Sequence, residues 1–133
     1  MRIFLFMPLI AALSGCQAYT VGFEQSYCTD VNLSDPGDPE IWFVEDGDDL
    51  LIIRSHAFVS SDWLFDPVVE IGARSVFGRV DFLVEEKWKE VGASEETSCI
   101  SPTLRVSDAV GDSFSVEWYE DEADGTPVAI GAN

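Results

Sequence analysis

Short runs of apolar residues, separated by turn-forming residues, recur along most of this chain. The clearest pair is residues 41–44 and 50–53, which flank the acidic stretch 45–49 with its Asp46-Gly47 step. Two apolar runs around an Asp-Gly step are a strong signal for a β-hairpin. Both runs are continuous rather than alternating, which predicts either a central hairpin that is covered on both faces or strands of a sandwich core.

The second half of the chain carries the alternating pattern of a half-buried strand. Residues 114–119 (FSVEWY) place an apolar side chain at every second position, which is the period of one buried strand face. We expect strand 113–120 to form a second hairpin with 103–106 around residues 108–112. Further strands are expected at 21–27, 50–58, 68–71 and 128–130, and a Pro-, Gly- and Asp-rich loop at 32–39.

Residues 76–91 fit two patterns. Their apolar residues fall at helical spacing, yet several of them also fit one face of a strand. Gly78, Gly92 and many β-branched residues favour two strands that turn near 85–86. One short helix near 76–91, ending at Gly92, is the alternative.

These elements together predict an all-β fold of about seven to nine short strands, either an antiparallel β-sandwich or a small barrel. The length of 133 residues suits one domain, which we place at residues 22–133. An early and a late cysteine with strands between them are compatible with an immunoglobulin-like architecture.

The amino terminus carries an export signal. Arg2 precedes the uncharged run 3–13 (IFLFMPLIAAL), which is too short to span a bilayer but has the length of a signal-peptide core. The run ends in Leu13-Ser14-Gly15-Cys16, which resembles the lipobox of bacterial lipoproteins. By these residues the chain resembles a bacterial lipoprotein. The domain that follows shows no resemblance to a known family.

The resemblance implies a cleaved signal peptide at 1–15, lipid (palmitate or a similar acyl chain) on Cys16, and a short tether at 16–21. Several acyl chains anchor a protein stably, because each buried methylene adds roughly 0.8 kcal/mol of membrane affinity. Gln17, where an Asp would favour retention in the inner membrane, implies sorting to the outer membrane. Display towards the periplasm and display at the surface both remain open.

Two cysteines remain if Cys16 carries lipid. In an oxidising compartment, Cys28 and Cys99 predict one disulfide bond. A pair of free buried thiols is the alternative. A zinc site is disfavoured because His56 is the only histidine.

Charge excludes one class of partner and suggests another. The chain has 25 acidic and 7 basic residues, a net charge of -18, whereas nucleic-acid binding needs a basic face. A basic envelope protein is a fitting partner, because complementary charge speeds encounter. Exported proteins that inhibit lysozymes also bind a basic enzyme, although the chain shows no motif of these inhibitors. Adaptation to saline surroundings is a further interpretation of the acidic composition.

The acidic loops give one candidate metal site. Asp46, Asp48 and Asp49 in one loop and Asp121 and Asp124 in another offer oxygen ligands beside glycines, and calcium prefers six to eight oxygens. The chain would then be a calcium-stabilised adhesive or binding module. Ordinary turn chemistry with a solvated acidic surface explains the same residues.

The single histidine does not indicate catalysis, and the aromatic residues near it have two interpretations. His56 has Ser55 nearby, but no Gly-x-Ser-x-Gly elbow is present, so we predict a protein that is not an enzyme. Trp63 and Phe65 form an apolar cluster flanked by loop residues, which is either an exposed anchor for a partner or part of the core. The sequence therefore predicts a lipid-anchored envelope protein with a binding or structural role and no cofactor other than, at most, calcium.

Overall fold

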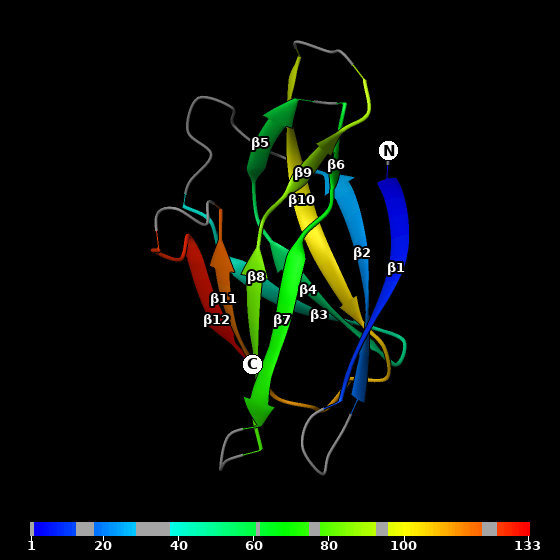
Figure 1. Ribbon diagram of the computed structural model, residues 1–133, viewed down its shortest axis with the longest axis vertical. Helices are drawn as coiled ribbons and strands as arrows, with labels where there is room; N and C mark the ends of the chain where they lie inside the picture. Colours follow the sequence, from blue (N-terminus) through cyan, green and yellow to red (C-terminus); the bar gives the residue numbers. More distant parts are fainter. Residues whose placement is uncertain are drawn as a thin grey trace.

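The computed structural model of the protein describes residues 2–12, 18–28, 38–60, 62–74, 78–92, 96–120 and 125–133, with the backbone alone for 2–12, 18, 73 and 74. All regular elements in these ranges are strands (Figure 1): β1 (Arg2–Ala12), β2 (Ala18–Tyr27), β3 (Ile41–Asp46), β4 (Asp49–Arg54), β5 (Ala57–Ser60), β6 (Trp63–Phe65), β7 (Val68–Arg74), β8 (Val80–Glu85), β9 (Trp88–Glu90), β10 (Thr97–Val106), β11 (Phe114–Tyr119) and β12 (Ala129–Ala132). The predicted all-β class is confirmed. The alternative of a helix near 76–91 is wrong within the described residues, because β8 and β9 occupy that segment.

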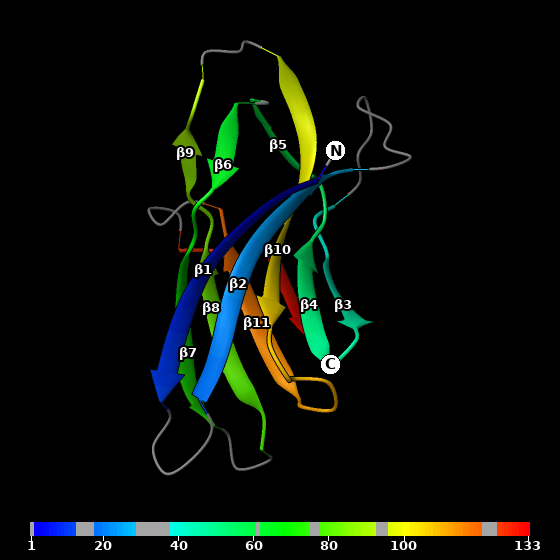
Figure 2. The ribbon, with the colours of Figure 1, turned by 90° about the vertical axis from the view of Figure 1, so that its right-hand side faces the viewer.

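Two sheets pack face to face as layers (Figures 1 and 2). One has the strand order β1-β2-β10-β4-β3, with β5 also paired to β10, and the other has the order β12-β11-β8-β7. A small third sheet joins β6 to β9. Of the two predicted alternatives, sandwich and barrel, this arrangement is the sandwich, because neither sheet closes on itself.

The core lies between the two layers. Its largest side chains come from both of these sheets and, in the case of Phe65, from β6 of the small third sheet, and each is at most 2% exposed: Phe23, Phe65, Phe82, Phe114 and Trp118. The alternation in β11 explains this arrangement, because Phe114, Val116 and Trp118 are buried while Glu117 between them is exposed. Burial of such large apolar side chains is the main driving force for assembling the layers.

The first predicted hairpin is confirmed as a pairing, but the expected cover on both faces is wrong for β3, which is the edge strand of its sheet and leaves Trp42 and Val44 each 43% exposed. β3 pairs antiparallel with β4 from Ile41↔Arg54 to Asp46↔Asp49, so Gly47 and Asp48 alone make the turn. Gly47 has φ +64°, the left-handed conformation that two-residue hairpin turns require and that glycine adopts without strain.

The second predicted hairpin is wrong, although both of its strands exist. β10 lies between β2 and β4 in one sheet, whereas β11 pairs in parallel with β8 in the other sheet. The segment between them crosses from layer to layer and is held by Ala109, which is fully buried and donates its N–H to the Asp48 carbonyl at 3.0 Å. Both strands have an apolar face, and opposite layers let both faces meet one core.

The predicted strands at 80–85 and 88–90 exist, but they do not turn back on each other. β7 pairs with β8 and β6 pairs with β9, so β6–β7 and β8–β9 are the two arms of one long hairpin. Both arms are interrupted at the same level, at Asp66-Pro67 and at Glu86-Lys87, where the Asp66 N–H donates to the Lys87 carbonyl at 2.8 Å. Such interruptions also explain why the strands outnumber the seven to nine expected.

The predicted disulfide is confirmed. Cys28, directly after β2, is bonded to Cys99 of β10, with the two Cα atoms 5.4 Å apart. β2 and β10 are neighbours in one sheet. The bond therefore differs from that of immunoglobulin domains, which joins the two sheets.

The amino-terminal strand lies at the edge of its sheet. β1 pairs with β2 alone, so in the full-length chain residues 2–12 add a strand to the domain, whereas the sequence places 1–15 outside it. The predicted tether at 16–21 is wrong for residues 18–21, because β2 begins at Ala18 and the side chains of Tyr19 and Val21 are buried in the core. Within the described residues, no helix has the length and apolar character needed to cross a membrane.

Candidate functional site

A pocket opens at one end of the sandwich, where long strands are interrupted. It has a volume of about 410 Å³ and is lined by three charged side chains, Arg54, Glu86 and Glu120, by the aromatic residues His56, Phe58 and Trp88, and by neighbouring apolar residues. Small-molecule sites occupy about 300–1,000 Å³ and combine apolar walls with a few convergent polar groups. The pocket has both properties.

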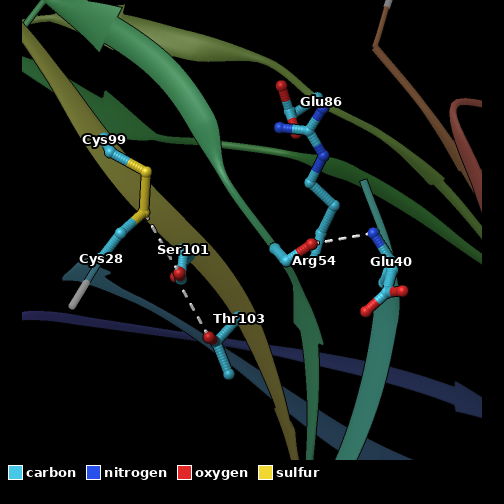
Figure 3. The surroundings of a disulfide bond; sticks show 8 residues. Cys28, Glu40, Arg54, Glu86, Cys99, Ser101 and Thr103 are labelled. Atoms are coloured by element: carbon cyan, nitrogen blue, oxygen red, sulfur yellow. Dashed lines mark hydrogen bonds and ion pairs between the residues drawn. A yellow bond between two sulfur atoms is a disulfide. The ribbon is translucent and has the colours of Figure 1, made fainter. Parts of the chain in front are cut away.

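Arg54 is the central polar group of this pocket. It occupies the third inward-facing position of β4, after the core residues Leu50 and Ile52, and only 3% of its surface is exposed. Its Nη1 lies 3.5 Å from Oε1 of Glu86, and its Nη2 donates to Oε2 of Glu120 at 3.4 Å. Figure 3 shows the guanidinium of Arg54 facing Glu86.

The donor groups of Arg54 are incompletely used. Charge-assisted hydrogen bonds normally measure about 2.7–2.9 Å, so both of its carboxylate contacts are long. Its Nε is buried and has no hydrogen-bond partner among the described residues. A buried donor without a partner costs about 1–3 kcal/mol, so Arg54 retains capacity for an acceptor oxygen.

Glu86, by contrast, is well satisfied. Its two carboxylate oxygens accept N–H groups from the indoles of Trp118 and Trp88, at 3.0 and 3.2 Å. Burial raises the pKa of the Glu86 carboxyl above its ordinary value, and the positive charge of Arg54 and the two indole N–H groups offset only part of this rise. The carboxyl therefore positions both tryptophans and Arg54.

His56 lies in the gap between β4 and β5 in an unusual backbone conformation. Its φ is +56°, a value that is uncommon for residues other than glycine. Ser55 just before it is held by two hydrogen bonds to Glu40, since its N–H donates to the Glu40 carbonyl at 2.9 Å and its hydroxyl accepts the Glu40 N–H at 2.8 Å. Non-glycine residues held at positive φ cluster at functional sites.

The disulfide supports the wall of the pocket from the neighbouring strand. β10 pairs first with β5 and then with β4 along its length, and Cys99 is directly opposite Phe58, which lines the pocket. The Cys28 N–H also donates to the Cys99 carbonyl at 3.0 Å. The bridge thus fastens β10 at the level where the strand beside it bends.

The acidic residues predicted as calcium ligands have another partner. Arg105 contacts Asp46 at 2.8 Å, Asp49 at 3.1 Å and Glu24 at 3.5 Å. The second oxygen of Asp49 accepts the Asp108 N–H at 3.2 Å. Asp48 contributes its carbonyl to two backbone N–H groups of the adjacent loop.

Within the part of the chain that the structure describes, no group of three or more His, Cys, Asp or Glu side chains is arranged to hold a metal ion. Asp121 and Asp124, the other predicted calcium ligands, lie outside the described residues. The calcium site stays a prediction. Cys16 and Gln17 also lie outside the described residues, and the lipid anchor stays a prediction with them.

Of the two interpretations of Trp63 and Phe65, the exposed anchor is wrong for Phe65 and its place in the core is confirmed. This ring is 1% exposed and stacks on Trp118, with ring centroids 5.9 Å apart and planes inclined by 9°. It faces inward because β6 continues the inner face of β7 at that end of the sandwich. Trp63 is half-buried, and its carbonyl accepts an N–H from Gln25 at 3.2 Å.

Sequence reasoning missed the residues of the pocket. One signal was present: Arg54 is the only Lys or Arg between residues 3 and 73, and it directly follows the apolar run 50–53. A single base at the end of a buried strand needs an acidic partner. Nothing in the sequence indicates that this partner is Glu86, 32 positions further on.

Comparisons with known proteins return no match: no protein-family model, no curated protein and no solved structure is significantly similar to the chain.

Proposed function

We propose that the protein is a lipid-anchored binding protein of the bacterial cell envelope, without enzymatic activity, and that the pocket at the end of the sandwich is its binding site. One observation carries the binding role. Arg54 is almost completely buried in the wall of a pocket, yet among the described residues its guanidinium has only long contacts and one nitrogen without a partner. A ligand with acceptor atoms would complete that environment.

The strand order is compatible with removal of a signal peptide. β1 pairs with β2 only, whereas β2 also pairs with β10 over seven consecutive residue pairs. Cleavage before Cys16 would remove an edge strand and leave the disulfide, the core and the pocket in place. The mature sheet would then begin at β2, a few residues after the lipid.

The anchor is tested by expressing the full-length chain in a bacterium with two membranes and comparing it with Cys16→Ser. We expect the unchanged chain to incorporate labelled palmitate and to fractionate with the outer membrane, and the variant to incorporate no label. Cys28→Ser/Cys99→Ser is the matched control and should still be labelled. Equal labelling of the Cys16→Ser variant, or no labelling of the unchanged chain, would contradict the anchor.

A second candidate function, inhibition of a basic envelope enzyme such as a lysozyme, is favoured by a separate feature. The outer face of the β12-β11-β8-β7 sheet has a depression of about 320 Å³ bordered by the carboxylates of Glu70, Asp81 and Glu117. Basic partners are attracted by such a face. Lysozyme should then lose activity in the presence of the protein, and Glu70→Gln/Glu117→Gln should restore it.

A further inference from the structure

We infer that the pocket binds one ring of an uncharged sugar, as part of a glycan of the envelope or of a surface that the cell meets. This inference rests on the proposed binding role and specifies its ligand class. It follows from three properties of the pocket: which hydrogen-bonding groups are unused, which apolar surfaces are rigid, and which charged groups surround Arg54.

The hydrogen-bonding groups with unused capacity at the pocket are buried nitrogens of Arg54 and of His56, whose Nδ1 has no partner among the described residues, beside the exposed carboxylate of Glu120. Arg54 has a buried Nε without a partner in the described structure and an Nη2 whose contact with Glu120 is 3.4 Å long. The Glu120 side chain is 61% exposed, so its oxygens are reachable from solvent. A sugar hydroxyl both accepts and donates, so adjacent hydroxyls can accept from Arg54 and donate to Glu120 at the same time.

The apolar side of a sugar ring requires a flat, rigid surface, and the pocket offers aromatic rings. Trp88 is fixed by its N–H donated to Glu86 and by its contact with Phe65, with ring centroids 5.3 Å apart. Phe58 also lines the pocket and is 38% exposed. Aromatic side chains bind a partner at low entropic cost because few of their bonds rotate.

The charges favour an uncharged ligand over an ion. Glu86 and Glu120 face Arg54 at 3.5 and 3.4 Å, and the whole chain carries a net charge of -18, so an anion is repelled at long range. A cation is attracted at long range but meets the buried positive charge of Arg54 inside the pocket. A neutral ligand avoids both costs.

The experiment titrates the purified full-length protein, in a detergent without a sugar head group, with methyl glycosides of glucose, galactose, mannose and N-acetylglucosamine. Isothermal titration calorimetry and NMR shifts report binding. We expect saturable binding of at least one glycoside with a Kd of about 1 mM or tighter, the range of a single small ring. Sodium chloride should change this Kd little, because no net charge is transferred.

Two exposed positions test the site without threatening the fold. Phe58→Ser and Glu120→Gln should each weaken binding about tenfold, which corresponds to roughly 1.4 kcal/mol. Val110→Ser is the matched control for Phe58, since both residues are 38% exposed and Val110 does not line the pocket. Glu45→Gln, at an exposed position of β3, is the control for Glu120. Neither control should change the Kd.

Three outcomes would overturn the inference. They are the absence of saturable binding for all four glycosides, binding that the Phe58 and Glu120 variants retain unchanged, and preferential binding of the charged probes acetate or N-acetyl-lysine amide at the pocket. The last of these would leave the proposed binding role standing and reject only the sugar. Failure of the palmitate experiment would remove the anchor without affecting the sugar result.

Discussion

At the scale of single residues, His56 has a positive φ, which among the described non-glycine residues only Asp108 shares. A non-glycine residue at φ +56° costs of the order of 1–3 kcal/mol. Its ring packs edge-on against Trp42, with centroids 6.1 Å apart, and the bonds between Ser55 and Glu40 hold the backbone on its amino-terminal side. The conformation is therefore imposed by the neighbouring structure and lets β4 end beside the pocket before β5 begins.

This strain can be measured with two substitutions of the same residue. His56→Ala removes the ring and keeps the steric penalty of positive φ, whereas His56→Gly removes both. We expect the glycine variant to be more stable than the alanine variant by about 1 kcal/mol, measured as the difference in the free energy of unfolding in urea. Greater stability of the alanine variant would show that positive φ is not imposed there.

Glu86 gives a second prediction at this scale, on pH. Because burial raises its pKa in the folded state, Glu86 stabilises the fold most below its unfolded pKa of about 4.3, and this contribution is lost as the pH rises through the folded pKa. The Glu86→Gln variant does not lose stability in this way, because the glutamine side chain does not ionise. The stability of this variant relative to the unchanged protein should therefore increase between pH 4 and neutrality.

Urea unfolding at a series of pH values provides the measurement, and each pKa unit of difference corresponds to about 1.4 kcal/mol. Glu120→Gln is the control, because Glu120 contacts the same guanidinium and is largely solvated. A relative stability of Glu86→Gln that falls with rising pH would mean that the charge of Arg54 outweighs the burial of Glu86.

At the scale of elements, local patterns predicted strands well and pairings only where the turn was short. The hairpin of β3 and β4 was predictable because its two-residue turn, Gly47 and Asp48, lies at the predicted Asp-Gly step between two adjacent apolar runs. The positions of β10 and β11 were predictable as strands, but their partners were not. Their pairing depends on which of the two sheets each strand joins. That choice is decided by contacts between residues far apart in the sequence.

The pocket was not predictable for the same reason. Its polar groups come from Arg54 at the end of β4, Glu86 after β8 and Glu120 after β11. Each is one unremarkable residue at the end of a strand. Only the stacking of the two layers brings the three strand ends together.

The disulfide carries the prediction at this scale. It closes a loop with a sequence separation of 71 residues, for which the chain-entropy model gives about 4 kcal/mol of stabilisation. Cys28→Ser/Cys99→Ser should lose roughly this amount in urea unfolding under oxidising conditions. Reductant should lower the stability of the unchanged protein to the same level and leave the variant as it was; a reductant effect on the variant would attribute the loss to something other than this bond.

At the scale of the whole molecule, the dominant property is a net charge of -18 with few local neutralisations. Arg105 is surrounded by three carboxylates, and Arg54 by two. The remaining acids repel one another across the surface, which destabilises the compact state. Added salt weakens this repulsion because the Debye length falls to about 10 Å at 0.1 M.

Thermal unfolding in sodium, magnesium and calcium chloride separates diffuse charge from a built metal site. Since Arg105 already occupies Asp46 and Asp49, we expect salt to raise the melting temperature and calcium to raise it no further than magnesium at equal concentration. Magnesium is the matched control because it has the same charge but prefers a rigid octahedral site.

A rise specific to calcium would instead show that acidic loops converge on the ion, since a ligand that binds only the folded state stabilises it by mass action. Asp48→Asn and Asp124→Asn would then have to abolish that rise for the predicted loops to be the site.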